Sequence, residues 1–360
     1  MRSSASTGLA VESFTGASAE VSRRKRLRRI AAGVTVAVAA VAIVSALGSA
    51  GAWWAARTQA QSAGTEQLQA SLSSLAQADD VLGRFDESYE QVFGATALKS
   101  TSVAADSRGA LSTTESEGIL ADHIQTLADE PSPQAVAQAG EALLASQDQA
   151  DEALDHLQDN DDREVANQVL ASLSKKTDMV SAAVAIQASA AQASAAWPSA
   201  SQAWEELVAA DESARSAASA LGDVTQEQVQ ESQEKGNQAI QGFQTAQSLL
   251  SQAAEAFPSC PFQPISDYVS LRLQALEQAQ ASNQALIDGD AEAALQHNDA
   301  YNDLDKQAAT AALDLPSSVG ALLQQAFLDD TSAARESYEQ ARLQSAASDA
   351  FIRDYLGTSQ

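Results

Sequence analysis

The sequence predicts an all-α protein: a single N-terminal transmembrane helix followed by an extracytoplasmic region of about eight helices, arranged as two tandem antiparallel helical bundles. Composition is the first reason. Alanine, glutamine, glutamate and leucine favour helix, and aromatic residues make up only 5% of the chain. Periodicity is the second reason, because apolar side chains beyond residue 56 recur every three or four positions, as on one face of a helix.

The predicted transmembrane helix covers residues 30–56, which contain no charged side chain. As a helix this segment is about 40 Å long, more than the ~30 Å hydrocarbon core of a bilayer. Lys and Arg beside a span stay in the cytoplasm. We therefore expect residues 1–29 to be a disordered cytoplasmic tail and the C-terminal part to lie outside the cell. The tail ends in a basic block formed by Arg23, Arg24, Lys25, Arg26, Arg28 and Arg29.

Cleavage after export is the alternative for this N-terminal segment. Ala50, Gly51 and Ala52 form a small-residue site of the A-x-A kind behind a basic and an apolar region, as in a secretory signal peptide. Cleavage near Ala52 makes the remainder a secreted helical factor. Two features favour an uncleaved signal-anchor: the apolar stretch is longer than a usual signal sequence, and the helical pattern continues beyond Trp53 and Trp54.

The charge distribution limits the partners. The chain has 21 Lys and Arg against 48 Asp and Glu, a net charge of -27. Residues 1–56 hold seven of the basic and two of the acidic residues, so residues 57–360 have a net charge of -32. An acidic region of this kind repels phosphate backbones, which excludes nucleic acid as a partner. The basic block, in contrast, can bind anionic lipid on the cytoplasmic leaflet.

The first predicted bundle comprises residues 57–197. Its helices are predicted over residues 65–92, 114–129, 133–157 and 165–196. Ser132 is the expected N-cap of the third helix, and Pro133 suits its first position. Trp197-Pro198 is expected to end or kink the fourth helix, because proline disfavours the helical conformation of the residue before it. We place the boundary between the bundles there.

The second predicted bundle comprises residues 198–360. The Gly and Pro positions in this half divide it into helices. The first of these helices is predicted to end near residue 221. The next three are predicted over residues 240–257, 265–276 and 291–313, and one last helix over residues 323–355. The last helix has near-heptad spacing, but Asp330, Ser345 and Ser348 interrupt its apolar seam. A bundle is therefore favoured over a long, strict coiled coil.

Candidate metal ligands do not converge in the sequence. The histidines His123, His156 and His297 have no HExxH or ExxH spacing, and we interpret them as surface or rim residues. Glu152 and His156 are four residues apart and lie on one helical face. We interpret this pair as two residues of a solvated helix surface and not as metal ligands.

Two acidic turns were considered as calcium loops. Asp288, Asp290, Glu292 and Asp299 have positions suited to an EF-hand, but Ala293 stands where that loop needs glycine. In the turn at residues 158–164, Arg163 occupies a ligand position. We interpret Asp290 and Asp162 as helix N-caps instead.

No catalytic, cofactor-binding or metal-binding residue is predicted, and we expect no enzymatic activity. Ser172 to Lys175 match the S-x-x-K pattern of penicillin-binding enzymes, but the chain lacks that family's K-T-G element. GxSxG, P-loop and GxGxxG motifs are also absent from the sequence. These observations favour a structural or protein-interaction module of the bacterial cell envelope, with an envelope protein or the cell wall as partner. An extracytoplasmic ligand-binding or sensor module that works through a partner protein is the alternative.

Self-association is the remaining partner prediction, through helical faces or through Cys260. The chain has one cysteine, so a disulfide can form only between chains.

Intact-mass spectrometry of a C-terminally tagged chain distinguishes the anchor from the cleaved signal. Because the apolar segment is long and uncharged, we expect the tagged chain in the membrane fraction, with a mass that begins near Met1. A chain recovered from the culture medium with a mass that begins near Trp53 would contradict the anchor.

Overall fold

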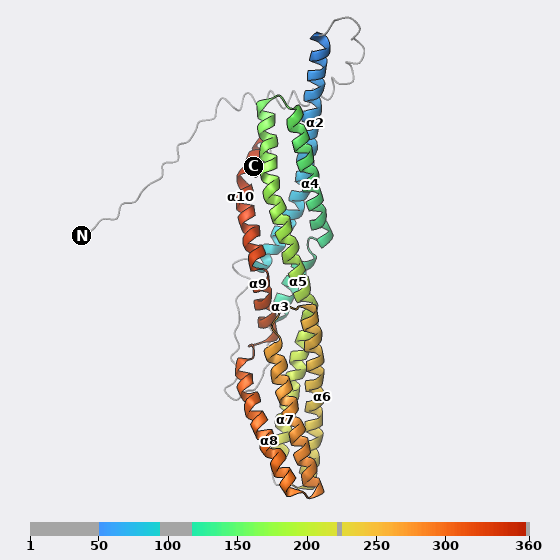
Figure 1. Ribbon diagram of the computed structural model, residues 1–360, viewed down its shortest axis with the longest axis vertical. Helices are drawn as coiled ribbons and strands as arrows, with labels where there is room; N and C mark the ends of the chain where they lie inside the picture. Colours follow the sequence, from blue (N-terminus) through green and yellow to red (C-terminus); the bar gives the residue numbers. More distant parts are fainter. Residues whose placement is uncertain (1–49, 94–116, 222–224, 358–360) are drawn as a thin grey trace, which may run out of the picture. The chain divides into compact units, whose positions relative to one another are not determined.

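The computed structural model describes residues 50–93, 117–221 and 225–357, and within these ranges it is all-α with no strand (Figure 1). This confirms the predicted fold class in its coarse form. The helices are α2 (Ala50–Phe93), α3 (Glu117–Asp129), α4 (Pro133–His156), α5 (Asn160–Ala220), α6 (Gln226–Ala256), α7 (Gln263–Asp288), α8 (Ala291–Ala311), the short 3-10 helix η2 (Ala312–Asp314), α9 (Val319–Asp330) and α10 (Ser332–Leu356).

The longest helix, α5, has 61 residues and is therefore about 90 Å long. Pro198 lies inside it. Of the two outcomes predicted at Trp197-Pro198, an end or a kink, the end is wrong. The predicted boundary between residues 57–197 and 198–360 falls within α5. The described residues from position 61 onward form one compact unit.

Packing on both sides of Pro198 explains why α5 continues. A proline in a helix interior costs about 3 kcal/mol, because it removes one backbone hydrogen bond and crowds the preceding turn. Buried side chains nevertheless recur every three or four residues through this position, from Ala190 and Ala193 before it to Ala203 and Leu207 after it. The apolar surface that these residues bury favours one continuous helix over a break.

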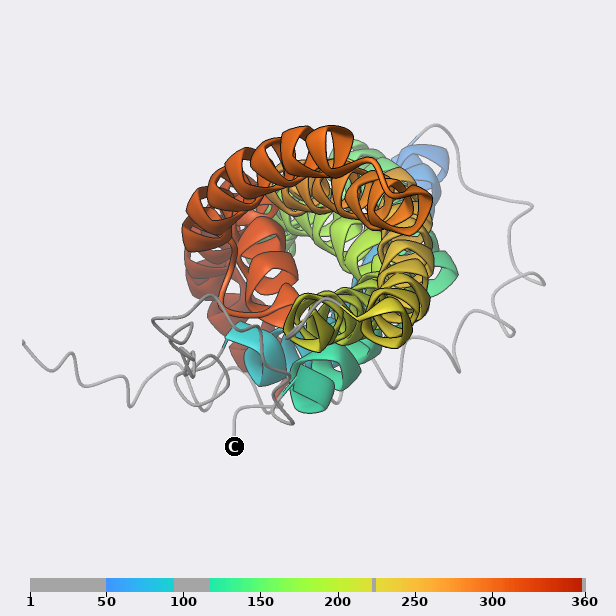
Figure 2. The same cartoon turned by 90° about the horizontal axis from the view of Figure 1, so that it is seen from below.

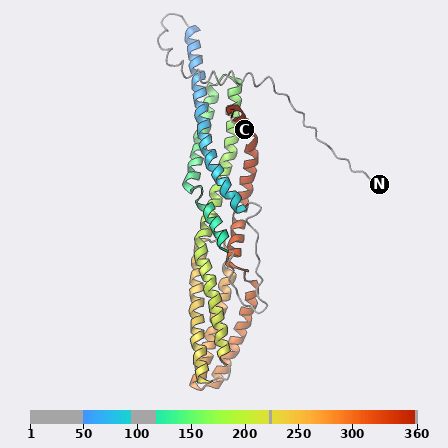
Figure 3. The same cartoon turned by 180° about the vertical axis from the view of Figure 1, so that it is seen from behind.

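The α2–α4–α10 group packs against the first part of α5. The hydroxyls of Ser71 in α2 and Ser146 in α4 lie 2.9 Å apart, and each donates to the other's backbone carbonyl at 2.8 Å. Ser172 of α5 donates to Asp349 of α10 at 2.6 Å. Figure 3 shows α2 and α10 on either side of α5 from behind. The apolar positions that predict this helix are mostly buried in α2, namely Leu68, Leu75, Leu82, Phe85, Tyr89 and Val92.

In the α6–α7–α8 group, α6 packs against the last part of α5, α7 against α6 and α8 against α7, and Figure 2 shows these helices side by side when viewed from below. Short turns join them, so that consecutive helices run antiparallel. Gly242 allows α6 to approach α5 closely, because a Cβ at this position would lie 2.9 Å from the Ala210 Cβ.

The helix ends match the sequence signals in most places. The Ser132 hydroxyl accepts from the backbone N–H of Ala135 at 3.2 Å, and Pro133 opens α4, as predicted. Asp290 caps α8 by accepting from Ala293 at 3.0 Å, which confirms the capping interpretation of this turn. Asp162 was assigned the wrong role. The cap of α5 is Asp159, because the helix begins at Asn160 and places Asp162 in its first turn.

The predicted last helix is divided into α9 and α10 at Thr331. The Thr331 hydroxyl donates to the Phe327 carbonyl at 2.7 Å, and the Ser332 hydroxyl donates to the Asp329 carbonyl at 2.9 Å. The Arg335 guanidinium donates to the Leu328 carbonyl at 3.0 Å. Side chains thus satisfy three carbonyls at the end of α9, which explains why the chain tolerates the break.

Most of the predicted transmembrane segment, residues 30–49, lies outside the described residues, as do all of residues 94–116 between α2 and α3. Among the described helices, α5 alone is long and apolar enough to cross a membrane. The apolar composition of α5 is also explained by its packing, because its small side chains contact α4 and α10 along one part and α6 along another.

A pair of glycine substitutions in α2 tests the close packing of α2 on α4. A Cβ at Gly64 would lie 2.9 Å from the backbone nitrogen of Leu157, whereas a Cβ at Gly83 meets nothing within 4 Å. We expect Gly64→Ala to lower the free energy of unfolding by about 1–3 kcal/mol through overpacking. Gly83→Ala should raise it by about 0.5–1 kcal/mol, because alanine favours helix. Urea denaturation measures both, and equal effects of the two variants would contradict the packing.

Candidate functional site

A buried cluster of charged and phenolic side chains joins α5, α7 and α8. Arg272 of α7 is only 8% exposed. Its guanidinium contacts Asp211 of α5 at 3.0 Å and Asp305 of α8 at 2.5 Å. The Tyr268 hydroxyl donates to the same Asp211 carboxylate at 2.9 Å, and Arg215 contacts its second oxygen at 3.2 Å. The charge of Asp211 is therefore fully paired.

The electrostatics of this cluster keep its arginine charged and its tyrosine neutral. Burial by itself lowers the pKa of the Arg272 guanidinium, but Tyr268, Asp211 and Asp305 raise it by more, so that the net shift is upward. Burial raises the pKa of the Tyr268 hydroxyl above its ordinary value, and the nearby Asp211 adds to the rise. The cluster therefore offers neither a free base nor a free acid at neutral pH.

A cavity of about 160 Å³ lies one helical turn beyond this cluster, between α5, α6, α7 and α8. Ala214, Leu276 and Tyr301 line it, and each is three or four residues from a member of the cluster on its own helix. The polar side chains that line the cavity are all uncharged. We call it the amide cavity after three of them; the polar set is Ser232, Gln280, Ser282, Asn283, Asn298 and Tyr301.

Hydrogen bonds fix two of the carboxamides of the amide cavity. Asn283, which is 3% exposed, donates to the Ser232 hydroxyl at 3.0 Å. Gln280 donates to the Gln233 carbonyl at 3.0 Å. Gly236 makes room for this contact, because a Cβ there would clash with the Gln280 amide. Two carboxamides of the cavity wall are thus oriented by hydrogen bonds, whereas the third, Asn298, is an exposed side chain of α8.

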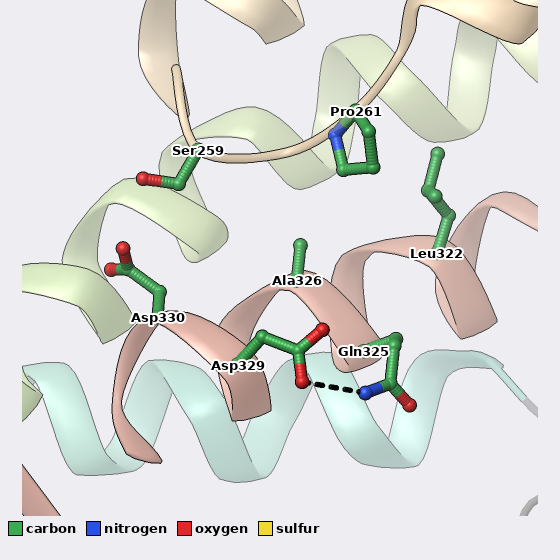
Figure 4. Close-up of a pocket in the computed structure, with 7 residues that line it drawn as sticks. All are labelled: Ser259, Pro261, Leu322, Gln325, Ala326, Asp329 and Asp330. Carbon is green, nitrogen blue, oxygen red and sulfur yellow. Dashed lines mark hydrogen bonds between the residues drawn. The ribbon is translucent and has the colours of Figure 1, made fainter. Parts of the chain in front are cut away.

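A second cavity, of about 320 Å³, lies between α9 and the loop that joins α6 to α7 (Figure 4). Leu322 and Ala326 point from α9 toward the Ser259–Pro261 loop. Gln325 donates to Asp329 at 2.8 Å within the rim. Of its seven lining residues only Ala326 is buried, and no buried polar group faces it. This cavity is larger but has less defined chemistry than the amide cavity.

The residues considered as metal ligands stay apart. His297 contacts Gln278 at 2.9 Å, and all three histidines are half-buried, in keeping with rim positions. In the part of the chain that the structure describes, no group of three or more His, Cys, Asp or Glu is placed to hold a metal ion.

The S-x-x-K residues do not form a reactive pair in the structure. Ser172 is buried and donates to Asp349, whereas Lys175 contacts Asp178 at 3.8 Å on the surface. The buried lysine is the next residue, Lys176.

Cys260 is buried in the loop between α6 and α7. Burial raises the pKa of its thiol to about 12, which suppresses the reactive thiolate. A disulfide between two chains through this residue would first require the loop to open.

Sequence reasoning did not identify Asp211, Arg272 or Asn283. A signal was present, because Arg272 interrupts the apolar positions Val269 and Leu276 of α7, and Asp211 follows the buried Ala210 of α5. A charged residue on an apolar face indicates a buried pair. The partner cannot be found this way, because α5 and α7 are 57 residues apart at the Asp211–Tyr268 contact.

Comparisons with known proteins give no relative: no known protein family, no curated protein and no solved structure matches this chain.

Removal of one carboxylate tests the buried cluster. Asp211→Asn takes a buried carboxylate from Arg272, which is itself 8% exposed, and we expect a loss of about 3–5 kcal/mol in the free energy of unfolding. Asp303→Asn is the matched control, because Asp303 is exposed and its contact with Lys306 is 3.5 Å long. The control should change stability by less than about 0.5 kcal/mol. Denaturant titration of both variants measures this, and a small effect of Asp211→Asn would contradict the role of the cluster.

Proposed function

We propose that this chain is a single-pass, membrane-anchored protein whose extracytoplasmic helical part acts as a structural or protein-interaction module of the bacterial cell envelope. The N-terminal segment supports the anchor, since a basic block precedes 27 uncharged residues from position 30 to position 56. The acidic net charge of the remainder supports a protein or cell-wall partner over nucleic acid.

The way in which α2 is attached carries the proposal. This helix begins at Ala50, inside the proposed span, and continues to Phe93. From residue 61 on, it is bound to α5 and α10 by polar side chains. Lys176 of α5 is 4% exposed and pairs with Asp79 of α2 and, at 3.0 Å, with Asp349 of α10. A module that is tethered through α2 needs such an attachment, because load on the anchor reaches the other helices through this helix.

Further contacts between α2 and α10 extend the attachment. The buried Tyr338 of α10 donates to Asp86 of α2 at 2.7 Å, and its ring lies 5.1 Å from the Phe85 ring in an edge arrangement. Tyr89 of α2 donates to Glu339 at 2.7 Å. Aromatic packing with satisfied hydroxyls holds the two helices in one register.

The surface supports a role in association. Large apolar side chains are exposed on α10 and η2, with Leu343 at 78% and Leu313 at 79% exposure. Because Cys260 is buried, we assign self-association in this proposal to helical faces and not to a disulfide.

A second candidate is an extracytoplasmic ligand-binding or sensor module that works through a partner protein. The observation that favours it is the amide cavity, whose polar lining is oriented by hydrogen bonds.

Cysteine labelling in intact cells tests the proposed topology. Cys260 gives little background because it is buried. We expect Leu313→Cys to react with a membrane-impermeant maleimide in intact cells, since the side chain at this position is exposed. Ser18→Cys, in the proposed cytoplasmic tail, should react only after permeabilisation. Labelling of Leu313→Cys only after permeabilisation would contradict the proposal.

A further inference from the structure

The amide cavity contains a polar atom that accepts no hydrogen bond from the described residues. Asn283 is 3% exposed, and its only hydrogen bond among the described residues is the one that its amide nitrogen donates to Ser232. The carboxamide oxygen of Asn283 therefore accepts no hydrogen bond from the described part of the chain. Because Asn283 lines the cavity, this oxygen is available to accept a hydrogen bond from a molecule that binds there.

The opposite wall offers further uncommitted groups. Tyr301 and Asn298 of α8 both line the cavity, and neither has a hydrogen-bond partner among the described residues. Burial raises the pKa of the Tyr301 hydroxyl, so this group stays protonated and can donate. Donors and acceptors thus face one space from two helices, α7 and α8.

The charge of the lining excludes an ionised occupant. No Asp, Glu, Lys, Arg or His is among the residues that line the cavity. The nearest buried cation, Arg272, already pairs with Asp211 and Asp305. An ionised ligand would lose its hydration here without gaining a counter-charge, which is strongly unfavourable.

The pattern of groups suits hydroxyls. A hydroxyl donates one hydrogen bond and accepts others, and carboxamides offer a donor and an acceptor side by side. The remaining wall has no polar side chain and consists of Ala214, Ala217, Ala218, Leu221, Gly236, Leu276 and Ala279. Apolar side chains of this kind can cover the C–H face of a ring. The volume of this space is about 160 Å³.

We propose that the amide cavity binds a small uncharged polyhydroxyl compound, of the size of a single sugar ring or a short polyol. Asn283 accepts from the ligand, Tyr301 and Asn298 bind it from α8, and the alanine and leucine side chains cover its apolar face. This inference rests on the second candidate function, to which it gives a ligand class. The test measures ligand binding alone. A negative result refutes the proposed ligand class and has no bearing on the proposed topology or anchor.

Saturation-transfer NMR on the full chain tests the site. The chain is kept in a polyoxyethylene detergent, because a sugar-based detergent would compete. The probes are glucose, N-acetylglucosamine and glycerol, with gluconate and glucosamine as charged counterparts. We expect saturation transfer to at least one neutral probe and none to the charged ones. Tyr301→Phe and Asn298→Ala should each weaken binding about fivefold, the effect of one lost hydrogen bond.

Asn302→Ala is the matched control, because Asn302 is also exposed on α8 but does not line the cavity. It should leave binding unchanged. Ala217→Leu fills the cavity and should abolish binding, and circular dichroism verifies that this variant folds. If Ala217→Leu does not fold, Tyr301→Phe and Asn298→Ala decide the test. Absence of transfer to every neutral probe would overturn the proposal. Equal transfer to gluconate or glucosamine, or an equal loss in Asn302→Ala, would overturn it as well.

Discussion

The continuity of α5 through Pro198 is the constraint on which the other helices depend. Helices α4 and α10 pack on the first part of this helix, and Lys176 joins α2 to it. Helix α6 packs on its last part and is followed by α7 and α8. A break at Pro198 would leave each group with only a fragment of its central helix. The small side chains of α5 make the arrangement feasible, because alanines such as Ala190 and Ala203 let neighbouring helices approach from more than one side.

Buried charge then fixes which helices meet. Apolar packing by alanine has little shape specificity, since each residue buries a small area. Lys176 selects Asp79 and Asp349, and Arg272 selects Asp211 and Asp305, so each cation joins three helices. Replacement of a buried ion pair by apolar residues can leave the free energy of unfolding unchanged. The best-supported role of such a pair is to fix the register of one helix against another. In this chain Arg272 also lies one helical turn from the amide cavity, on the same helix as Leu276, which lines it.

The sequence predicted local features well and distant ones poorly. The α2 stripe, the Ser132 cap and the Asp290 turn depend on residues within one or two helical turns, and the structure confirms them. The continuation of α5 through Pro198 and the break between α9 and α10 at Thr331 depend on the helices that pack around these positions. Local helix propensity does not encode this packing. The amide cavity was missed for the same reason. Its polar residues come from three helices of the described chain and match no motif.

Hydrogen exchange followed by mass spectrometry tests the central claim most directly. Peptides that cover residues 194–202 report on the backbone around Pro198. If α5 is one continuous, buried helix, these amides exchange as slowly as those of the flanking segments 182–190 and 203–210. Exchange of residues 194–202 at the rate of an open loop, between two protected segments, would contradict the account and restore two separate helices.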